Sequence, residues 1–324
     1  MTTRYLYVMD PLEFINPEGD TTFDFLLESQ RRGVENHVCA INDLWSVGSD
    51  GFARTRPVEV WRPTASRPSH CRMSDPVTHA FHDFRVIWMR KDPPVDDAFL
   101  QSTMLLDRHD PSRTLVLNTP SSLRIANEKL WGLFAAELGP HTVVSARREV
   151  LLEELARLGR AVLKPISGAG GSGVMVFDHG DKNVRSAIDI LTQEGRRVAV
   201  LQEYLPAVRR GDKRVILLGG DPIGAVWRVP QGDDHRANMH VGGAAQRAEI
   251  EEDDRRIAAR LKPELLKLGL HFVGIDVIGG RLTEVNVTSP TGVQEIDRLD
   301  GRQGAECLSA QVMDYVEKLS AGLV

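Results

Sequence analysis

The stretch GLHFVGIDVIGGRLTEVNVTSPTG, residues Gly269–Gly292, contains two short runs in which apolar and polar side chains alternate. The runs are His271–Val277 and Leu282–Val287, and the glycine pair between them is typical of the turn of a β-hairpin. Strand register normally buries the two apolar rows together. The side chains that this register places on the opposite face are Asp276, Glu284 and Asn286.

This register requires an odd number of residues in the turn. The simplest such turn is Ile278-Gly279-Gly280, with Gly280 in the left-handed conformation. A turn of Gly279 and Gly280 alone would place Glu284 opposite the apolar row of the first strand, which is an implausible core. The predicted buried row comprises Val273, Ile275, Val277, Val285 and Val287.

Two carboxylates and an amide oxygen on one sheet face suit Mg²⁺. This hard cation takes oxygen ligands and usually completes its shell with nucleotide phosphates. The alternative is an exposed sheet face with ordinary polar side chains, and the hairpin by itself favours neither interpretation. The rest of the chain has to distinguish metal binding from a solvated face.

Composition predicts a globular protein and excludes several functions. The chain has 324 residues, 42% of them hydrophobic, which is enough for two or three domains. The formal charge of −5 gives no support to nucleic-acid binding, and no run approaches the ~20 apolar residues of a membrane span. The N-terminal apolar run is too short for a signal peptide. Three widely spaced cysteines predict a reducing cytoplasm, without disulfides or structural zinc.

The first ~120 residues alternate strand and helix signals in the manner of an open α/β sheet. Arg62–Asp75 is rich in Pro, Arg and Ser and is interpreted as a surface excursion. Charged residues such as Arg90 follow the carboxyl ends of strands, where open α/β sheets bind ligands, although helix caps and turns explain them equally well. The predicted strands are Tyr5–Met9, His37–Ile41, Val86–Met89 and Thr114–Leu117.

A Gly-rich loop, Gly168–Gly173, joins two predicted strands, Ala161–Leu163 and Val174–Phe177. It is not a Walker loop, which requires Gly-Lys-Ser/Thr opening a helix, and it is not a Rossmann fingerprint, because no helix follows. The backbone N–H groups of such a loop can bind phosphates as a nest, but flexible glycine loops are common. Upstream, a helix over residues 121–134 is predicted to carry Asn127-Glu128-Lys129.

The second half of the chain alternates strands with polar segments. Strands are predicted at Val198–Leu201 and Ile223–Trp227, and helices at Asp253–Leu268 and Gly304–Ala321. The polar loop Asp233–Ala245 is too long for a simple connection, and loops of that kind often close over active sites.

Together, these elements resemble the ATP-grasp enzymes and, within them, the bacterial glutathione synthetases. The resemblance covers nearly the whole chain with the motifs in the same order, and the last motif is fairly specific. The matching motifs are VMDP (Val8–Pro11), MRKDPP (Met89–Pro94), NEKL (Asn127–Leu130), LKP (Leu163–Pro165), YLP (Tyr204–Pro206), GDKR (Gly211–Arg214), RVPQG (Arg228–Gly232), RAN (Arg236–Asn238), FVGID (Phe272–Asp276) and LTEVNVTSPTG (Leu282–Gly292).

The resemblance implies an α/β fold with an N-terminal open α/β domain at residues 1–122, which binds substrate. Two ATP-grasp subdomains at 123–203 and 204–324 would clamp ATP between them. It also implies a role for each matching residue, and Mg²⁺ or Mn²⁺ as the metal. These residues are Lys129, Lys164, Gly168, Gly170, Gly171, Ser172, Gln202, Glu203, Tyr204, Leu205 and Asp212 for ATP; Arg214 and Arg228 for catalysis; Arg90, Arg236, Asn238, Ser289 and Thr291 for substrate carboxylates; and Asp276, Glu284 and Asn286 for the metal. By this resemblance, backbone groups of Gln202–Leu205 would read the adenine edge, and Asp212 would accept hydrogen bonds from the ribose hydroxyls.

The implied reaction is ATP-dependent ligation of γ-glutamylcysteine and glycine through an acyl-phosphate, giving glutathione, ADP and phosphate. The loops Gly168–Gly173 and Asp233–Ala245 would close the site, and family analogy adds a homo-oligomer. Two alternatives stay open: an ATP-grasp ligase that joins another acid and amine, and a nucleotide-binding regulatory protein without turnover. The chain departs from the family pattern where Ala244 stands in place of an arginine in the long loop, and Trp45–Val77 matches poorly.

Overall fold

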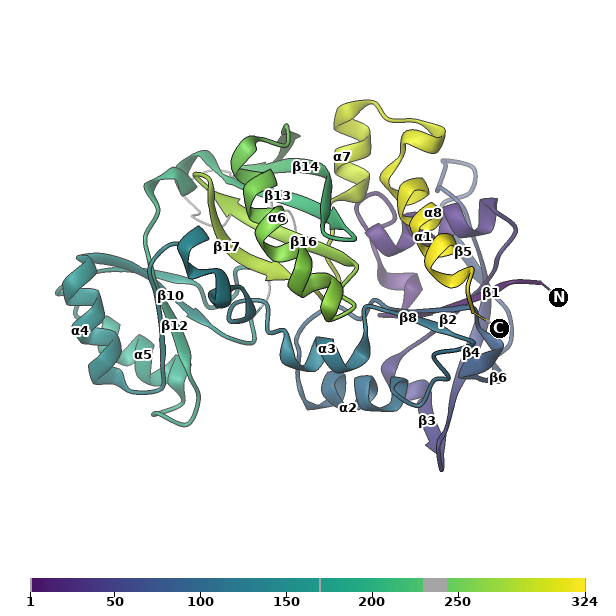
Figure 1. Cartoon of the computed structure of the whole chain (residues 1–324), viewed down its shortest axis with the longest axis horizontal. Helices are drawn as coiled ribbons and strands as arrows, with labels where there is room; N and C mark the ends of the chain where they lie inside the picture. Colours follow the sequence, from purple (N-terminus) through teal and green to yellow (C-terminus); the bar gives the residue numbers. More distant parts are fainter. Residues whose placement is uncertain (1, 169, 230–243, 324) are drawn as a thin grey trace.

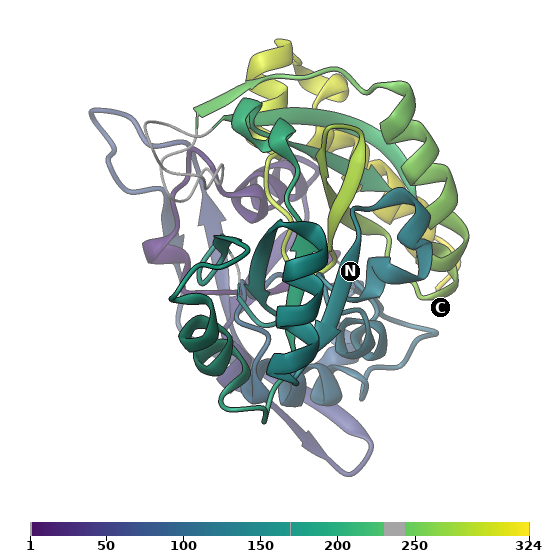
Figure 2. The same cartoon turned by 90° about the vertical axis from the view of Figure 1, so that its left-hand side faces the viewer.

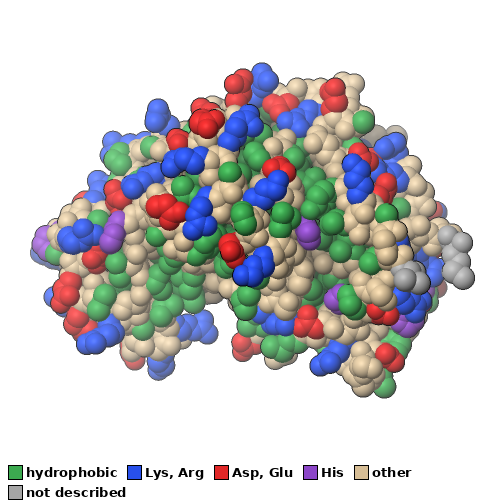
Figure 3. Space-filling view, in the orientation of Figure 1, with side chains coloured by type: hydrophobic (Ala, Val, Ile, Leu, Met, Phe, Trp, Pro, Cys, Tyr) green, Lys and Arg blue, Asp and Glu red, His purple; other side chains and the backbone are tan. Residues whose placement is uncertain are grey.

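Three β-sheets organise the protein, whose computed structural model describes residues 2–168, 170–229 and 244–323 (Figure 1). The sheets follow one another along the sequence, with the sheet of β10 and β12 at one end and the N-terminal sheet at the other. Within these residues no helix is long and apolar enough to cross a membrane. On the face in Figure 3, basic and acidic side chains are intermixed.

The N-terminal sheet has a parallel core in which β1 pairs with β2 and β7, and β7 pairs with β8. This confirms the predicted α/β arrangement. Helix α1 begins where Asp20 caps it by accepting a hydrogen bond from the Phe23 N–H. The parallel strands are β1 (Arg4–Val8), β2 (Glu35–Cys39), β7 (Val86–Met89) and β8 (Leu115–Leu117), and the helices are α1 (Thr21–Arg31), α2 (Asp97–Leu106) and α3 (Pro120–Ile125).

Antiparallel strands extend this sheet beyond β2, and the sequence analysis missed them. The long strand β4 pairs with β2, β3, β5 and β6. Arg62–Asp75, interpreted as a surface excursion, is exposed or half-buried throughout and contains the short strand β5, which was not predicted. Residues along β4 alternate between buried and exposed, and the matching alternation of side chains in the sequence is the signal that could have revealed this extension. The strands are β3 (Leu44–Val47), β4 (Asp50–Val60), β5 (Cys71–Met73) and β6 (Val77–Ala80).

The second sheet is antiparallel, in the order β11-β10-β12-β9, with α4 and α5 against it (Figure 2). Its apolar side chains form a cluster of their own, separate from the clusters under the other two sheets. Its strands are β9 (Thr142–Ser145), β10 (Arg160–Pro165), β11 (Met175–Asp178) and β12 (Ala199–Glu203), and its helices are α4 (Arg148–Leu158) and α5 (Val184–Thr192).

The C-terminal sheet is antiparallel in the order β15-β14-β13-β16-β17, and α6 crosses it in Figure 1. Its strands are β13 (Asp212–Leu218), β14 (Asp221–Val229), β15 (Ala244–Arg247), β16 (Phe272–Ile278) and β17 (Arg281–Asn286). The helices of this part are α6 (Glu252–Lys267), α7 (Val293–Asp300) and α8 (Leu308–Ser320). Short 3-10 helices lie at Leu12–Phe14, Ile41–Asp43, Phe81–Asp83, Trp131–Leu138, Pro206–Arg210 and Gly304–Glu306.

Three predicted elements need correction. The helix over 121–134 ends at Ile125, because the Asn127 side chain accepts a hydrogen bond from the Lys129 N–H and holds the segment in a turn. The predicted loop Asp233–Ala245 ends in β15, and its residues 233–243 lie outside the described residues. The predicted helix from Gly304 is a short 3-10 helix followed by α8, while α7 was not predicted.

The hairpin pairs Asp276 with Glu284 and Gly274 with Asn286, which confirms the predicted faces. The odd-numbered turn is wrong. Ile278 pairs with Arg281, so the turn has only Gly279 and Gly280, both in the left-handed region at φ 58° and 75°. The odd residue is instead a bulge at Thr283, whose hydroxyl donates to the Asp276 carbonyl at 3.0 Å.

The Asn118 side chain fastens the N-terminal sheet to the C-terminal sheet. Its amide nitrogen donates to the carbonyls of Phe272 and Val287, each at 2.8 Å. Its oxygen accepts from the backbone N–H groups of His271 and Phe272 at 2.9 and 3.1 Å. Apolar side chains of both sheets meet in one cluster, so these two sheets share a core.

Replacing Asn118 with Ala should lower the free energy of unfolding by about 2–4 kcal/mol, because it leaves buried peptide groups without partners. Urea unfolding monitored by circular dichroism measures this change. The exposed Asn183, whose side chain makes no capping hydrogen bond, provides the matched control Asn183→Ala. Equal stability of Asn118→Ala and the control would contradict the fastening role.

Candidate active site

A cavity of about 410 Å³ lies where the second sheet faces the C-terminal sheet. It is lined by β10, the Gly-rich loop, β13, β14, the β16–β17 hairpin and the segment that follows it. The structure thereby brings together residues that are far apart in the sequence. The predicted site residues among its walls are Lys164, Gly170, Gly171, Asp212, Arg214, Arg228, Asp276, Glu284, Asn286, Ser289 and Thr291.

Cross-strand pairing builds the floor of this cavity. Asp212 pairs with Arg228 across β13 and β14, and Arg214 pairs with Asp276 across β13 and β16, so their side chains share one face. Gly274 in β16 is required here, because a Cβ atom would lie 2.9 Å from the Pro290 Cβ and 3.1 Å from the Arg214 Cδ.

The Asp276 carboxylate is held by two arginines. Arg214 donates from Nε to Oδ1 at 2.5 Å and from Nη2 to Oδ2 at 3.0 Å, and the Arg228 Nη2 lies 2.9 Å from Oδ2. Arg228 also forms a two-point pair with Asp212. Burial alone would raise the pKa of Asp276, but the two guanidinium groups outweigh it and hold that pKa well below its usual range.

The predicted ribose acceptor, Asp212, lines the cavity and is also paired with Arg228. Burial raises the pKa of Asp212, while Arg228 opposes this effect and Asp276 adds to it. The carboxylates and guanidinium groups therefore form one compensated network along the cavity floor. Such a network fixes the directions of the guanidinium groups before any substrate binds.

Lys164 stands opposite this floor, on β10. Its Nζ donates to the Gln202 side-chain oxygen at 2.9 Å and lies 3.8 Å from the Glu284 Oε1. Burial, together with nearby Lys129, lowers the pKa of Lys164, and Glu284 opposes the shift. A buried ammonium group with one distant carboxylate partner is suited to an anionic ligand such as phosphate.

The donor set at the hairpin fits a hard cation. In the described part of the chain no three His, Cys, Asp or Glu side chains cluster as a metal site, as expected where one of three ligands is an amide. The Asn286 Nδ2 is buried without a hydrogen-bond partner. Cross-strand pairing puts this side chain on the same sheet face as Asp276 and Glu284, so its amide is available to a ligand bound there.

The Gly-rich loop reaches the cavity through Gly170 and Gly171, which both have positive φ. The buried Lys129 does not line this cavity, because its Nζ donates to the Gly168 carbonyl. Gly168 has no room for a side chain, since a Cβ would lie 2.8 Å from the Ser172 carbonyl oxygen. Ser172 itself is exposed and lies outside the cavity wall.

The predicted adenine-reading segment Gln202–Leu205 also lies outside this cavity. Gln202 and Lys129 line a narrow space of about 20 Å³, which shares the walls Glu128, Thr283 and Glu284 with the larger cavity. The backbone N–H of Glu203 donates to the His141 carbonyl at 2.8 Å, and that of Tyr204 donates to the Arg160 carbonyl at 3.4 Å. Two of the backbone N–H groups expected to read adenine are thus engaged within the protein.

Arg90 is buried beside the cavity, with 3% of its surface exposed. Its Nε donates to the Thr22 hydroxyl at 3.0 Å and its Nη2 to the Pro290 carbonyl at 3.1 Å, but its Nη1 has no partner. A buried cation with a free donor suits a substrate carboxylate. Arg236 and Asn238 lie outside the described residues.

Sequence reasoning missed several residues that line the cavity, most of them within recognised motifs. Glu128 belongs to the NEKL motif, where only the lysine received a role. Asp92 and Pro93 belong to the MRKDPP motif, and Thr288 lies within LTEVNVTSPTG. Since these motifs were recognised, their neighbouring polar residues were the signal that could have identified them.

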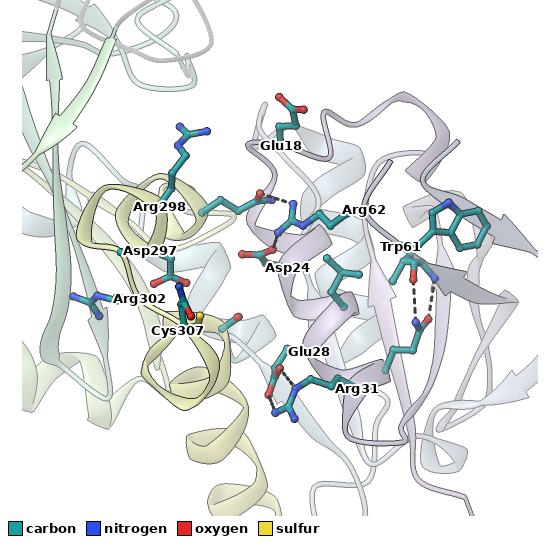
Figure 4. Close-up of a pocket in the computed structure, with 17 residues that line it drawn as sticks. Glu18, Asp24, Glu28, Arg31, Trp61, Arg62, Asp297, Arg298, Arg302 and Cys307 are labelled. Atoms are coloured by element: carbon teal, nitrogen blue, oxygen red, sulfur yellow. Dashed lines mark hydrogen bonds and ion pairs between the residues drawn. The ribbon is translucent and has the colours of Figure 1, made fainter. Parts of the chain in front are cut away.

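A larger cavity, of about 1090 Å³, lies between α1, α7 and the start of α8 (Figure 4). None of the predicted site residues lines it. Its acids are engaged within the protein: Arg62 pairs with Asp24, and the Asp297 carboxylate accepts from the Leu308 N–H at 3.0 Å. Burial raises the pKa of Asp24 and of Asp297 to about 6. This cavity therefore contains two carboxyl groups with raised pKa values at a contact between helices, and it lies apart from the predicted site residues.

Comparisons with known proteins agree with the cavity. A model of the prokaryotic glutathione synthetase N-terminal domain matches residues 3–124, and one of the prokaryotic glutathione synthetase ATP-grasp domain matches 128–301. Glutathione synthetase of Thermosynechococcus vestitus is 44% identical over 317 residues, 96% of this chain and 98% of that one. Glutathione synthetase of Salmonella typhimurium is 40% identical over 291 residues, 90% of this chain and 91% of that one.

Solved structures give the fold independently. A D-cycloserine synthetase superposes with a TM-score of 0.66 at 18% identity, over 99% of this chain and all of that one. A RimK domain ATP-grasp protein from Sphaerobacter thermophilus gives a TM-score of 0.59 at 18% identity, over 97% of this chain and 99% of that one. Fold and family models together define an ATP-grasp enzyme, an ATP-dependent ligase.

Within that class, the chain belongs to the prokaryotic glutathione synthetase family, since the two family models cover most of its length. The division at residues 122 and 203, and the role of each site residue, stay predictions.

The cavity between the helices predicts a pH dependence of stability. Asp24 has its pKa raised from 3.8 to about 6, so between these values the folded state binds more protons than the unfolded state and stability falls as pH rises. The free energy of unfolding of the wild type minus that of Asp24→Asn should therefore be larger at pH ~4.5 than at pH ~7. Urea midpoints measure this, with Asp75→Asn as the exposed control. An unchanged difference at both pH values would contradict the raised pKa.

Proposed function

We propose that this protein joins γ-glutamylcysteine to glycine, forming glutathione with conversion of ATP to ADP and phosphate. The observation that carries this proposal is the cavity in which Lys164, on β10, lies opposite a floor of Arg214, Arg228 and Asp276, with Glu284 and Asn286 also in its lining. Anion-binding cations and oxygen ligands for a cation line the same cavity, as transfer of a phosphoryl group between two oxygens requires.

In the first step, the cysteinyl carboxylate attacks the γ-phosphorus of ATP, and ADP leaves. Lys164 would neutralise phosphate charge, and Arg214 and Arg228 would steady the transferred phosphoryl group and the resulting acyl-phosphate. The free Arg90 Nη1 supports binding of a substrate carboxylate next to Pro290. The network of Asp276 and Asp212 keeps the guanidinium groups in position, so little rearrangement is needed during the reaction.

Asp276, Glu284 and Asn286 would hold Mg²⁺, or Mn²⁺ in its place. When bound, such an ion would supply positive charge that neutralises the charge developing on the phosphates. In the second step the amine of glycine attacks the acyl carbon and phosphate leaves. The protein supplies no covalent nucleophile, and its contribution is positioning, charge neutralisation and exclusion of water from an intermediate that hydrolyses readily.

A substrate-omission assay tests the function. Phosphate release from ATP is measured with γ-glutamylcysteine and glycine together and with each omitted in turn. Turnover that requires both substrates supports the proposal. Preference for another acid or amine would assign the chain to a different ligation, and ATP binding without phosphate release would overturn catalysis altogether.

Glu284→Gln should lower turnover by about 100-fold or more, because it removes the charge of one proposed metal ligand. Circular dichroism should show the fold retained, since Glu284 is half-buried and its cation partner lies 3.8 Å away. The exposed Glu153 on α4 provides the matched control, Glu153→Gln. A Glu284→Gln enzyme that keeps most of its activity would remove Glu284 from the metal site.

A further inference from the structure

Glu128 is a carboxylate of the cavity wall without an assigned role. Its carboxylate accepts a hydrogen bond from the Thr288 hydroxyl at 2.7 Å, and its backbone carbonyl accepts one from the Val285 N–H at 2.9 Å. The backbone bond places the residue alongside β17, and the side-chain bond aims the carboxylate into the cavity. Glu128 lines both the cavity of about 410 Å³ and the narrow space of about 20 Å³ beside it.

Three carboxylates of the cavity have a cationic partner. Asp276 is paired with Arg214 and Arg228, Asp212 with Arg228, and Glu284 lies 3.8 Å from Lys164. Among the described residues, no Lys, Arg or His side chain forms an ion pair with the other two carboxylates of the cavity wall, Glu128 and Asp92. Desolvation raises the pKa of Glu128 and Glu284 adds to the shift, while the Thr288 hydrogen bond and the charges of Lys129 and Arg214 oppose it. Such a carboxylate gains most from a ligand that brings hydrogen-bond donors and positive charge.

Two ligands of the proposed reaction carry hydrogen-bond donors on a positively charged nitrogen, the dipeptide and the amine substrate, whereas a metal ion carries none. The α-ammonium group of γ-glutamylcysteine is separated from the reacting carboxylate by most of the dipeptide's length. Glu128 lines the same cavity as Lys164 and Arg214, the groups proposed to bind the phosphoryl group. The amino group of the second substrate must reach the acyl carbon next to that phosphoryl group.

We propose that the Glu128 carboxylate accepts hydrogen bonds from the ammonium group of the amine substrate and positions its nitrogen against the acyl-phosphate, with Thr288 holding the carboxylate in place. The ammonium group loses one proton to solvent before its nitrogen attacks the acyl carbon; the C–N bond then forms, the C–O bond to phosphate breaks, and phosphate leaves with the second N–H proton. This inference rests on the proposed function, since it concerns the second half of that reaction. It assigns the cavity wall formed by the NEKL motif to the amine, opposite the floor that binds the phosphoryl group.

Two acceptors test the proposal in Glu128→Gln. Glycine carries an ammonium group, whereas hydroxylamine is largely uncharged at neutral pH and traps an acyl-phosphate as the hydroxamate. The variant should lose about 10- to 100-fold in kcat/KM for glycine, the loss expected for a hydrogen bond to a charged group. Hydroxamate formation and the KM values for ATP and γ-glutamylcysteine should stay within about 3-fold of wild type. Glu128→Asp, which keeps the charge, should recover part of the glycine activity.

The outcomes separate this inference from the proposed function. If the wild type does not use glycine, the proposed function fails, and the assignment of Glu128 to glycine is overturned with it. If the wild type uses glycine but Glu128→Gln loses hydroxamate formation equally, Glu128 acts on ATP, the metal or the first step, and the inference is overturned. A raised KM for γ-glutamylcysteine would overturn it as well, by assigning Glu128 to the dipeptide. Glu153→Gln serves again as the exposed control.

Discussion

Compensation of the buried Asp276 carboxylate is the constraint on which the site depends. Its partners, Arg214 and Arg228, come from two other strands, so the charge balance holds only while β13, β14 and β16 keep their register. Removing one partner from a buried ion pair leaves the other charge uncompensated, which costs more than the pair contributes. The same residues therefore keep the C-terminal sheet in register and direct the guanidinium groups into the cavity.

Sequence reasoning predicted the sheet faces because burial enforces them. Val273 and Ile275 had to be buried, and that fixed Asp276 and Glu284 on the other face. The position of the extra residue in the hairpin was less predictable, because the same register results from a three-residue turn or from a two-residue turn with a bulge. The bulge at Thr283 is accompanied by a hydrogen bond from its hydroxyl to the Asp276 carbonyl, which the alternation of side chains does not specify. The break after Ile125 has the same origin, since a single Asn127 contact outweighs helix propensity.

Motif order predicted which residues the site contains, but it did not predict how they are paired. Asp212 was expected to be open to ribose, whereas its two-point contact with Arg228 became visible only with both strands in place. Lys129 likewise donates to the Gly168 carbonyl instead of lining the cavity that holds Lys164 and Asp276. Pairing depends on distances between side chains from separate elements, and spacing along one chain does not encode those distances.

The separate apolar cluster beneath β9 to β12 makes the second sheet a cooperative unit of its own. The other two sheets share a core and the Asn118 contacts. We therefore expect their amide hydrogens to exchange together, with a free energy of opening close to that of global unfolding, and those of the second sheet to exchange with a lower free energy of opening. A nucleotide bound in the cavity lined by Lys164 of β10 and Arg214 of β13 would contact both units. Nucleotide binding would therefore slow amide hydrogen exchange in the second sheet, because local unfolding of that sheet would require the nucleotide to dissociate.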